Sequence, residues 1–239
     1  MRTITTNHCP NHVFTNAIGD NPNSAYNEDN TYTIPLYPEY DTSEQLDLSA
    51  KGAEIGVTFN GAMIFSPYAG PSVGTATDYS TSATAIEGDT FDECGGHSST
   101  SSQASYHIHV APSCLLSQLG QTDDAHSPQI GWALDGFPVY GPRGPDGTMM
   151  QTCTVSGGTY GTDICTDDCA GYYADTGDGY VYRYYVLGDY HGLTDDSCET
   201  PTDPLPGAEY FPFTMNCFNG CMPSGVDGSY SSLNDCSGR

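Results

Sequence analysis

Two histidines separated by a single residue, His107 and His109, have the clearest potential for chemistry in this sequence. They lie in the run 106–110, which predicts a β-strand, and residues i and i+2 of a strand point to the same face. Two imidazoles about 7 Å apart on one face can bind the same metal ion. His97 follows Cys94-Gly95-Gly96, where a disulfide and two glycines could hold a loop close to that strand.

Two further residues, His126 and Asp135, flank a predicted strand around Trp132, and either could supply a third or fourth ligand. Neutral imidazole suits zinc and copper, and a carboxylate can complete such a site. The sequence therefore predicts a Cu or Zn site built from these residues: His97, His107, His109, His126 and Asp135. In the alternative interpretation the histidines hydrogen-bond Tyr and Asp groups in a polar core, and Asp135-Gly136 is only a turn.

Oxygen-rich segments offer a different kind of metal site. They are 20–23, 27–30 and the aspartates Asp163, Asp167, Asp168, Asp175 and Asp178. Hard oxygen ligands on turns suit Ca²⁺, although none of these segments has the spacing of an EF-hand. The alternative to a calcium site at these Asp/Asn-rich loops is a solvated acidic surface.

The cysteines indicate an oxidising compartment. There are ten: Cys9, Cys94, Cys114, Cys153, Cys165, Cys169, Cys198, Cys217, Cys221 and Cys236. An even number in a loop-rich chain is typical of disulfides in secreted proteins. Two C-x-x-x-C pairs, Cys165/Cys169 and Cys217/Cys221, leave zinc as the alternative. We expect all ten to form disulfides, and their spacing does not determine the pairing.

Charge narrows the range of partners. The 239 residues carry 30 acidic and only 5 basic side chains, which gives a formal net charge of −25. Binding to nucleic acid or to an anionic membrane surface is therefore not expected. No apolar run reaches the roughly 18 residues needed to span a bilayer. The cysteines predict a secreted, extracellular chain, and since residues 1–6 contain no apolar signal segment, we expect that its signal peptide has been removed.

Turn signals and short apolar runs predict the elements that position these residues. Asn60-Gly61 within 53–68 predicts a hairpin, and strands are expected at 32–37, 106–110, 130–134, 137–140 and 180–187. One helix is expected at 113–120, whereas 71–105 is low in apolar residues and is interpreted as a long surface excursion. We therefore predict an all-β or β-rich, sandwich-like single domain, stapled by disulfides, with long loops and one or two short helices.

Several motifs carry a family resemblance. In order they are Cys9-Pro10-Asn11-His12, Asp20-Asn21-Pro22-Asn23, 55–61, Cys94-Gly95-Gly96-His97, Tyr106-His107-Ile108-His109 and 126–141. Together they resemble the YHYH-domain proteins, with Ile108 in place of the second tyrosine of the eponymous motif. The resemblance is best over 5–145 and looser over 180–220. It implies one domain over 1–239, with 146–239 as a Cys/Tyr-rich continuation packed on the first part, and it implies no particular activity.

For function, the sequence favours a secreted structural or matrix role, including self-assembly into filaments, with a divalent metal at the His cluster. The 18 tyrosines could pack a sheet, stack on extracellular glycans or form contacts in a homo-oligomer or polymer. The alternative is a metal-dependent enzyme acting on an extracellular polysaccharide or another polymer. No nucleophile elbow, HExxH, P-loop or dinucleotide fingerprint is present, so no catalytic residue is predicted. An open coordination position would favour the enzyme.

Overall fold

The fold follows from short strands that are joined by tight turns and by disulfide-linked loops. The computed structural model describes residues 1–12, 25, 27–48, 54–71, 81–98, 105–174, 177, 179–188 and 211–221.

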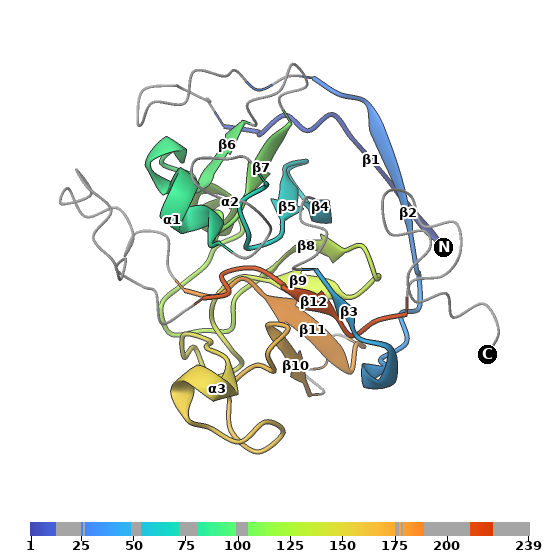
Figure 1. The fold of residues 1–239 in the computed structure, drawn as a ribbon, viewed down its shortest axis with the longest axis vertical. Coiled ribbons are helices and arrows are strands. Elements are labelled where there is room, and N and C mark those ends of the chain that lie inside the picture. Colours follow the sequence, from blue (N-terminus) through green and yellow to red (C-terminus); the bar gives the residue numbers. More distant parts are fainter. Residues whose placement is uncertain are drawn as a thin grey trace.

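A mixed sheet of eight strands forms the centre of this part of the chain (Figure 1). Its strands are β4 (Glu54–Thr58), β5 (Met63–Phe65), β6 (Gly96–Ser98), β7 (Tyr106–Ile108), β8 (Gln129–Ala133), β9 (Pro138–Tyr140), β10 (Gly171–Tyr173) and β11 (Tyr182–Tyr185). They lie in the order β10-β11-β9-β8-β4-β5-β7-β6. The β5/β7 and β9/β11 pairs are parallel, and the other pairs are antiparallel.

Two glycine turns fix the register of the central strands. Gly61, between β4 and β5, has φ 91°, and Gly136, between β8 and β9, has φ 93°. Glycine adopts such values without steric cost, which explains why Asn-Gly and Asp-Gly stand at these positions. The hairpin predicted around Asn60-Gly61 is confirmed, and the strands predicted on either side of Asp135-Gly136 form a second one.

Two small antiparallel sheets accompany the central one. β1 (Arg2–Thr6) pairs with β2 (Asn30–Ile34), and β3 (Leu46–Asp47) pairs with β12 (Cys217–Phe218). Phe218 of β12 contacts Tyr184 of β11, with ring centroids 6.2 Å apart. The β3/β12 sheet therefore packs its apolar side into the same core as the central sheet.

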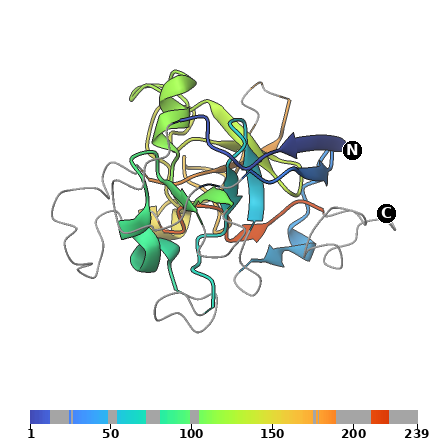
Figure 2. The same ribbon diagram turned by 90° about the horizontal axis from the view of Figure 1, so that it is seen from above.

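The helices of the described residues are short, and they lie around the sheet (Figure 2). They are α1 (Ala83–Glu87), α2 (Ser113–Gln118), α3 (Cys153–Ser156) and the 3₁₀ turns η1 (Thr42–Glu44) and η2 (Gly88–Thr90). α2 confirms the predicted helix, but α1, η2 and β6 replace part of the predicted surface excursion. None of the described helices is long and apolar enough to cross a membrane.

Disulfides join segments that are distant in sequence. The pairs are Cys94–Cys114, Cys153–Cys165 and Cys169–Cys217, and Cys221 is also disulfide-bonded. The expectation that all ten cysteines pair is wrong for Cys9, which has a free thiol. The backbone of Cys9 lies against the Gly61 turn of the β4/β5 hairpin, and that hairpin contains no cysteine. Cys198 and Cys236 lie outside the described residues.

Tyrosine is a core residue in this fold. Tyr182, Tyr184 and Tyr185 of β11 are fully buried, together with aliphatic residues such as Ile55 and Val139. The predicted β-rich, disulfide-stapled class is confirmed, because short strands and loops make up most of the described chain.

Candidate metal centre

Three of the predicted ligands lie together at one edge of the central sheet. His97 on β6 stands directly opposite His107 on β7 in the antiparallel ladder. His109 follows two residues after His107 and lies on the same side, as strand alternation requires. The ring centroids are 4.5 Å apart for His97 and His107, 4.9 Å for His107 and His109, and 5.6 Å for His97 and His109.

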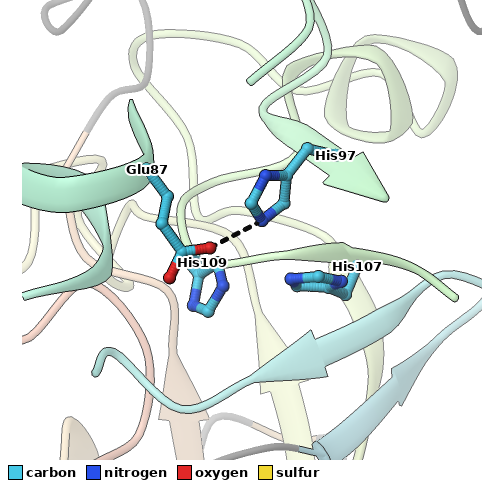
Figure 3. A group of neighbouring side chains, drawn as sticks. All are labelled: Glu87, His97, His107 and His109. Carbon is cyan, nitrogen blue, oxygen red and sulfur yellow. Dashed lines mark ion pairs between the residues drawn. The ribbon is translucent and has the colours of Figure 1, made fainter. Parts of the chain in front are cut away.

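A carboxylate completes the group. Glu87, the last residue of α1, places its Oε2 3.3 Å from Nε2 of His97 (Figure 3). We call Glu87, His97, His107 and His109 the histidine cluster; one ligand atom from each lies within 4.8 Å of all the others. Tetrahedral ligands on metal bonds of about 2.1 Å are about 3.4 Å apart, so each side chain would move inward by less than about 1 Å.

Backbone carbonyls fix the tautomers of the two β7 histidines. Nδ1 of His107 lies 3.0 Å from the carbonyl oxygen of Ser105, and Nδ1 of His109 lies 2.7 Å from that of Ser66. A carbonyl oxygen can only accept, so each Nδ1 carries the proton. Each Nε2 therefore presents a lone pair, which is the form that a metal ion requires.

The hydroxyl of Thr90 fixes the tautomer of His97. The Thr90 hydroxyl donates its one proton to the carbonyl of Glu87 at 2.6 Å, and its oxygen lies 2.7 Å from Nδ1 of His97. The hydroxyl must then accept from Nδ1–H, which leaves a lone pair on Nε2 of His97. All three imidazoles thus carry the proton on the nitrogen held by an acceptor, as metal-binding histidines commonly do.

The centre of the cluster contains acceptors without donors. Nε2 of His97 and Nε2 of His109 are buried and have no hydrogen-bond partner among the described residues. Burial holds the pKa of His97 and of His107 well below the usual value and lowers the pKa of His109 to about 4. Burial also raises the pKa of Glu87 to about 7. The 3.3 Å contact therefore joins a neutral imidazole to a carboxyl group, and once that carboxyl is ionised, only a cation between the two groups makes the contact favourable.

Aromatic rings separate the histidine cluster from the rest of the core. Phe65 stacks on His107 at 3.8 Å between centroids, and Phe91 meets His97 edge-on at 4.8 Å. The same Phe91 ring lies parallel to that of His109 at 5.9 Å. An apolar wall of this kind excludes water and strengthens any interaction between the ligands and a cation.

The structure does not bring His126 or Asp135 to this cluster. Nε2 of His126 lies 2.8 Å from the hydroxyl of Tyr185, and its ring stacks on Tyr140 at 5.0 Å. Asp135 is fully buried and accepts from the Tyr184 hydroxyl at 2.6 Å and from two backbone N–H groups. Burial raises the pKa of Asp135 to about 6.

Asp135 is part of a larger carboxylate network, formed by Asp135, Asp167, Tyr182, Tyr184 and Asn219. Asp167 accepts from the Tyr182 hydroxyl and the Asn219 amide, both at 2.8 Å. It also accepts from the backbone N–H groups of Cys169 and Gly171. Burial raises the pKa of Asp167 to about 6. These two aspartates are thus structural acceptors in the described fold.

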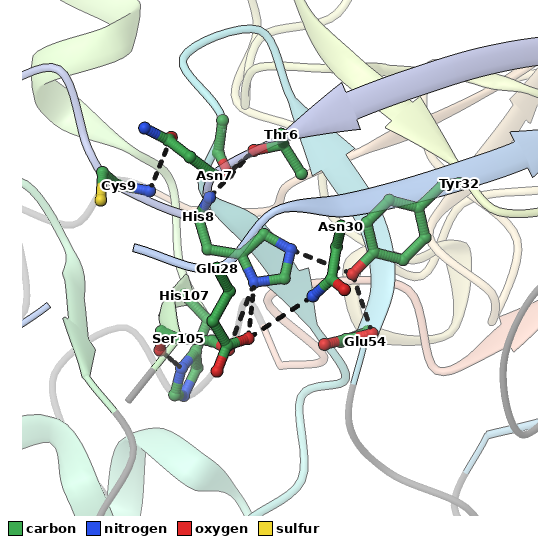
Figure 4. A network of polar contacts seen from close by, with 11 residues as sticks. Thr6, Asn7, His8, Cys9, Glu28, Asn30, Tyr32, Glu54, Ser105 and His107 are labelled. Atoms are coloured by element: carbon green, nitrogen blue, oxygen red, sulfur yellow. Dashed lines mark hydrogen bonds and ion pairs between the residues drawn. The ribbon is translucent and has the colours of Figure 1, made fainter. Parts of the chain in front are cut away.

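A polar network behind His107 includes the buried His8 (Figure 4). Nδ1 of His8 lies 3.2 Å from the hydroxyl of Ser105, and that hydroxyl donates to Glu28 at 3.0 Å. Nε2 of His8 lies 3.0 Å from the hydroxyl of Tyr32, which donates to Glu54. Because the Ser105 carbonyl accepts from His107, this network holds one outer partner of the histidine cluster in place.

A second group of potential ligands lies on the opposite face of β7. His12, Cys94 and Cys114 each place one ligand atom within 4.8 Å of the others, although the two cysteines form a disulfide. Tyr106 donates to Asp92 at 2.8 Å, and Nε2 of His12 lies 3.0 Å from the same oxygen.

The described acidic loops use their oxygens locally. Asp163 accepts from the backbone N–H of Thr159, and Asp168 accepts from the hydroxyl of Thr154. Within the part of the chain that the structure describes, neither group of potential metal ligands includes an acidic residue of these loops. The segment 20–23 and residues Asp175 and Asp178 lie outside the described residues.

Glu87 and Thr90 were not predicted from the sequence. Both lie in the segment that was interpreted as a surface excursion, where the short run 83–87 gives little helical signal. A carboxylate ten residues before His97 was the available clue, but only the fold of 81–98 shows that its side chain turns back to the imidazole.

Together, the fold and the cluster define a disulfide-stapled β-sheet protein with a preformed set of three imidazoles and one carboxylate. The family model described as "YHYH protein" matches residues 31–220. The chain therefore belongs to the YHYH family, as the motifs predicted. No curated protein and no solved structure shows significant similarity to it.

Proposed function

We propose that this chain is a secreted protein that binds one divalent transition-metal ion, Zn²⁺ or Cu²⁺, at the histidine cluster. The observation that carries the proposal is the convergence of three Nε2 lone pairs and the Glu87 carboxylate in a buried site. In a core built only for its own stability, such acceptors would face donors.

The ligand set favours a structural role for this metal. Three histidines and one glutamate supply four protein ligands, which is the number that fills a tetrahedral shell. His97, His107 and His109 are each at least 95% buried. A closed shell would join α1 to β6 and β7, and it would leave no coordination position for a substrate. For this reason we favour a structural or matrix component over the alternative, an enzyme acting on an extracellular polysaccharide or another polymer.

An extracellular location is supported by the disulfides. Three pairs lie within the described residues, and such bonds persist in oxidising compartments. A protein with a net charge of −25 that packs into a matrix or filament would need cations between its copies, and calcium at the acidic loops would serve that purpose. Contacts with extracellular glycans or with further copies would use exposed aromatic side chains such as Tyr37, which is 86% exposed.

We also propose that residues 1–239 form a single domain. Support comes from β11, which pairs with β9 in the central sheet, and from β12, which pairs with β3. Both features connect the Cys/Tyr-rich continuation to the part that contains the histidine cluster.

Calorimetric titration of the chelator-treated, oxidised chain with Zn²⁺ and Cu²⁺ tests the proposed metal site. We expect one site per chain in the wild type and none in the double variant His107→Gln/His109→Gln. His126→Gln is the matched control, because His126 lies outside the cluster, and it should bind as the wild type does. Equal binding by the wild type and the double variant would refute the proposal.

A further inference from the structure

His12, Cys94 and Cys114 lie on the opposite face of β7 as a second group of potential metal ligands, and the two cysteines are joined by a disulfide. We infer that His12, Cys94 and Cys114 bind a soft metal ion, Cu⁺ or Zn²⁺, once a thiol reductant has opened the Cys94–Cys114 disulfide. One ligand atom from each residue already lies within 4.8 Å of the others. Thiolate sulfur selects Cu⁺ and also binds Zn²⁺, so this site differs in chemistry from the histidine cluster.

His12 is held in the orientation of a ligand. Nε2 lies 3.0 Å from Asp92 Oδ2 and 3.2 Å from the Tyr106 hydroxyl. Nδ1 is buried, and none of the described residues offers it a hydrogen bond. A carboxylate on one ring nitrogen fixes the imidazole and makes the other nitrogen a better metal ligand.

The two cysteines are positioned by contacts that do not depend on their disulfide. Asp92 Oδ1 accepts from the backbone N–H of Cys94 at 2.9 Å. Cys114 lies in the first turn of α2, where the neighbouring Ser113 donates to the carbonyl of Glu93 at 2.8 Å. This hydrogen bond ties the start of α2 to the residue before Cys94. The thiols should therefore stay close together after reduction.

The site borders a small pocket with space for about one water-sized group. His12 and both cysteines line it, together with Asn60, Pro112 and Leu115. The pocket lies on the Tyr106/Ile108 side of β7, whereas His107 and His109 point to the other side. The two proposed metal sites are thus separated by the strand and can be tested independently.

A thiol reductant opens the Cys94–Cys114 disulfide by thiol–disulfide exchange. Two molecules of a monothiol such as glutathione each give up one electron and one proton. They form their own disulfide, and Cys94 and Cys114 become thiols. Zn²⁺ then displaces the two thiol protons and binds two thiolates and one neutral imidazole. In an oxidising compartment the disulfide keeps the site closed, so metal binding there would report loss of the oxidising conditions.

Cobalt(II) distinguishes the two sites, because only thiolate ligands give an intense sulfur-to-cobalt charge-transfer band in the near ultraviolet. The oxidised chain should bind Co²⁺ without this band. After reduction with a phosphine, the wild type should show the band. His12→Ala, which retains every cysteine, should bind Co²⁺ at this site about tenfold or more weakly. The variant Cys94→Ala/Cys114→Ala should lose one equivalent of thiolate-bound cobalt.

Absence of the band in the reduced wild type would overturn the inference, as would an unchanged band in His12→Ala. The His12 variant also covers the case in which reduction unfolds the chain, because cobalt bound to an unfolded, cysteine-rich chain would not depend on this residue. Failure of this site would leave the histidine cluster untouched, since that cluster contains no cysteine and is tested on the oxidised protein.

Discussion

The histidine cluster and the carboxylate network are both buried and polar, but they differ in what their lone pairs face. In the carboxylate network both aspartates accept hydrogen bonds on both oxygens, from tyrosine hydroxyls, the Asn219 amide or backbone N–H groups. In the histidine cluster Nε2 of His97 and of His109 have no hydrogen-bond partner among the described residues, and Nε2 of His97 lies only against the Glu87 carboxyl. The first arrangement is complete within the chain, whereas in the proposed function a cation completes the second.

The largest expected effect is a loss of stability when the carboxylate network is broken. Asp135→Ala leaves the Tyr184 hydroxyl and the backbone N–H groups of Phe137 and Gly220 without their acceptor. At about 1–3 kcal/mol for each buried donor, the free energy of unfolding should fall by about 4 kcal/mol. Urea unfolding at pH 7 measures this.

The exposed Asp168 gives the matched control for that experiment, and Asp168→Ala should change stability by less than about 0.5 kcal/mol. In the metal-free chain His109→Gln should cost less than about 2 kcal/mol, because its Nε2 bonds to none of the described residues. A cost for His109→Gln equal to that for Asp135→Ala would contradict the distinction between the two regions.

The next effect is on the pH dependence of stability. Burial raises the pKa of Asp135 from 3.8 to about 6, so the folded chain holds a proton that the unfolded chain releases. Asp135 therefore contributes stability that is fully present below pH 3.8 and is lost as the pH rises through 6. At about 1.36 kcal/mol per unit of pKa, the wild type should lose about 3 kcal/mol relative to Asp135→Asn between pH 3 and pH 7.

The measurement is the free energy of unfolding of the wild type and of Asp135→Asn at both pH values. The difference between the two proteins is compared between the two pH values, and contributions from the histidines cancel in this double difference. A double difference near zero, or one of the opposite sign, would show that Asp135 is not held in the environment described here.

A smaller effect is the stabilisation of the oxidised chain by metal. Zn²⁺ at 100 times its dissociation constant should raise the free energy of unfolding by about 2.7 kcal/mol. Asp135→Asn should keep this increment and His107→Gln/His109→Gln should lose it, as measured by unfolding with and without zinc. A loss in Asp135→Asn would mean that the two regions are not independent.

The smallest effect concerns Thr90, which holds the tautomer of His97. Thr90→Val keeps the shape of the side chain but removes the acceptor for Nδ1–H, so zinc affinity should fall about tenfold. The matched substitution Thr154→Val removes a hydroxyl that bonds only the exposed Asp168 among the described contacts, and it should leave the affinity unchanged. Equal affinities for both variants would argue against a role for the tautomer.

The sequence predicted those features of the fold that depend on neighbouring residues alone, namely turns and the faces of strands. Asn60-Gly61 and Asp135-Gly136 marked real hairpins because only a few residues tolerate a positive φ. The spacing of His107 and His109 placed them on one face, because side chains alternate along a strand.

The sequence did not predict contacts that depend on how a long loop folds back or on the order of the strands. Glu87 reaches His97 only because 81–98 folds back on itself, and no local pattern in a polar, turn-rich segment encodes that path. His126 and Asp135 flank a strand close to the cysteine-rich half, but the strand order puts β4 and β5 between β8 and β7. The free thiol of Cys9 also depends on the fold, since an even number of cysteines does not require every one to pair.

Anomalous diffraction at the zinc edge, from crystals of the oxidised chain grown with Zn²⁺, tests the central claim most directly. The account predicts one strong peak about 2.0–2.1 Å from Nε2 of His97, His107 and His109 and from a Glu87 oxygen. A fully occupied peak elsewhere, or none between these four side chains, would contradict it.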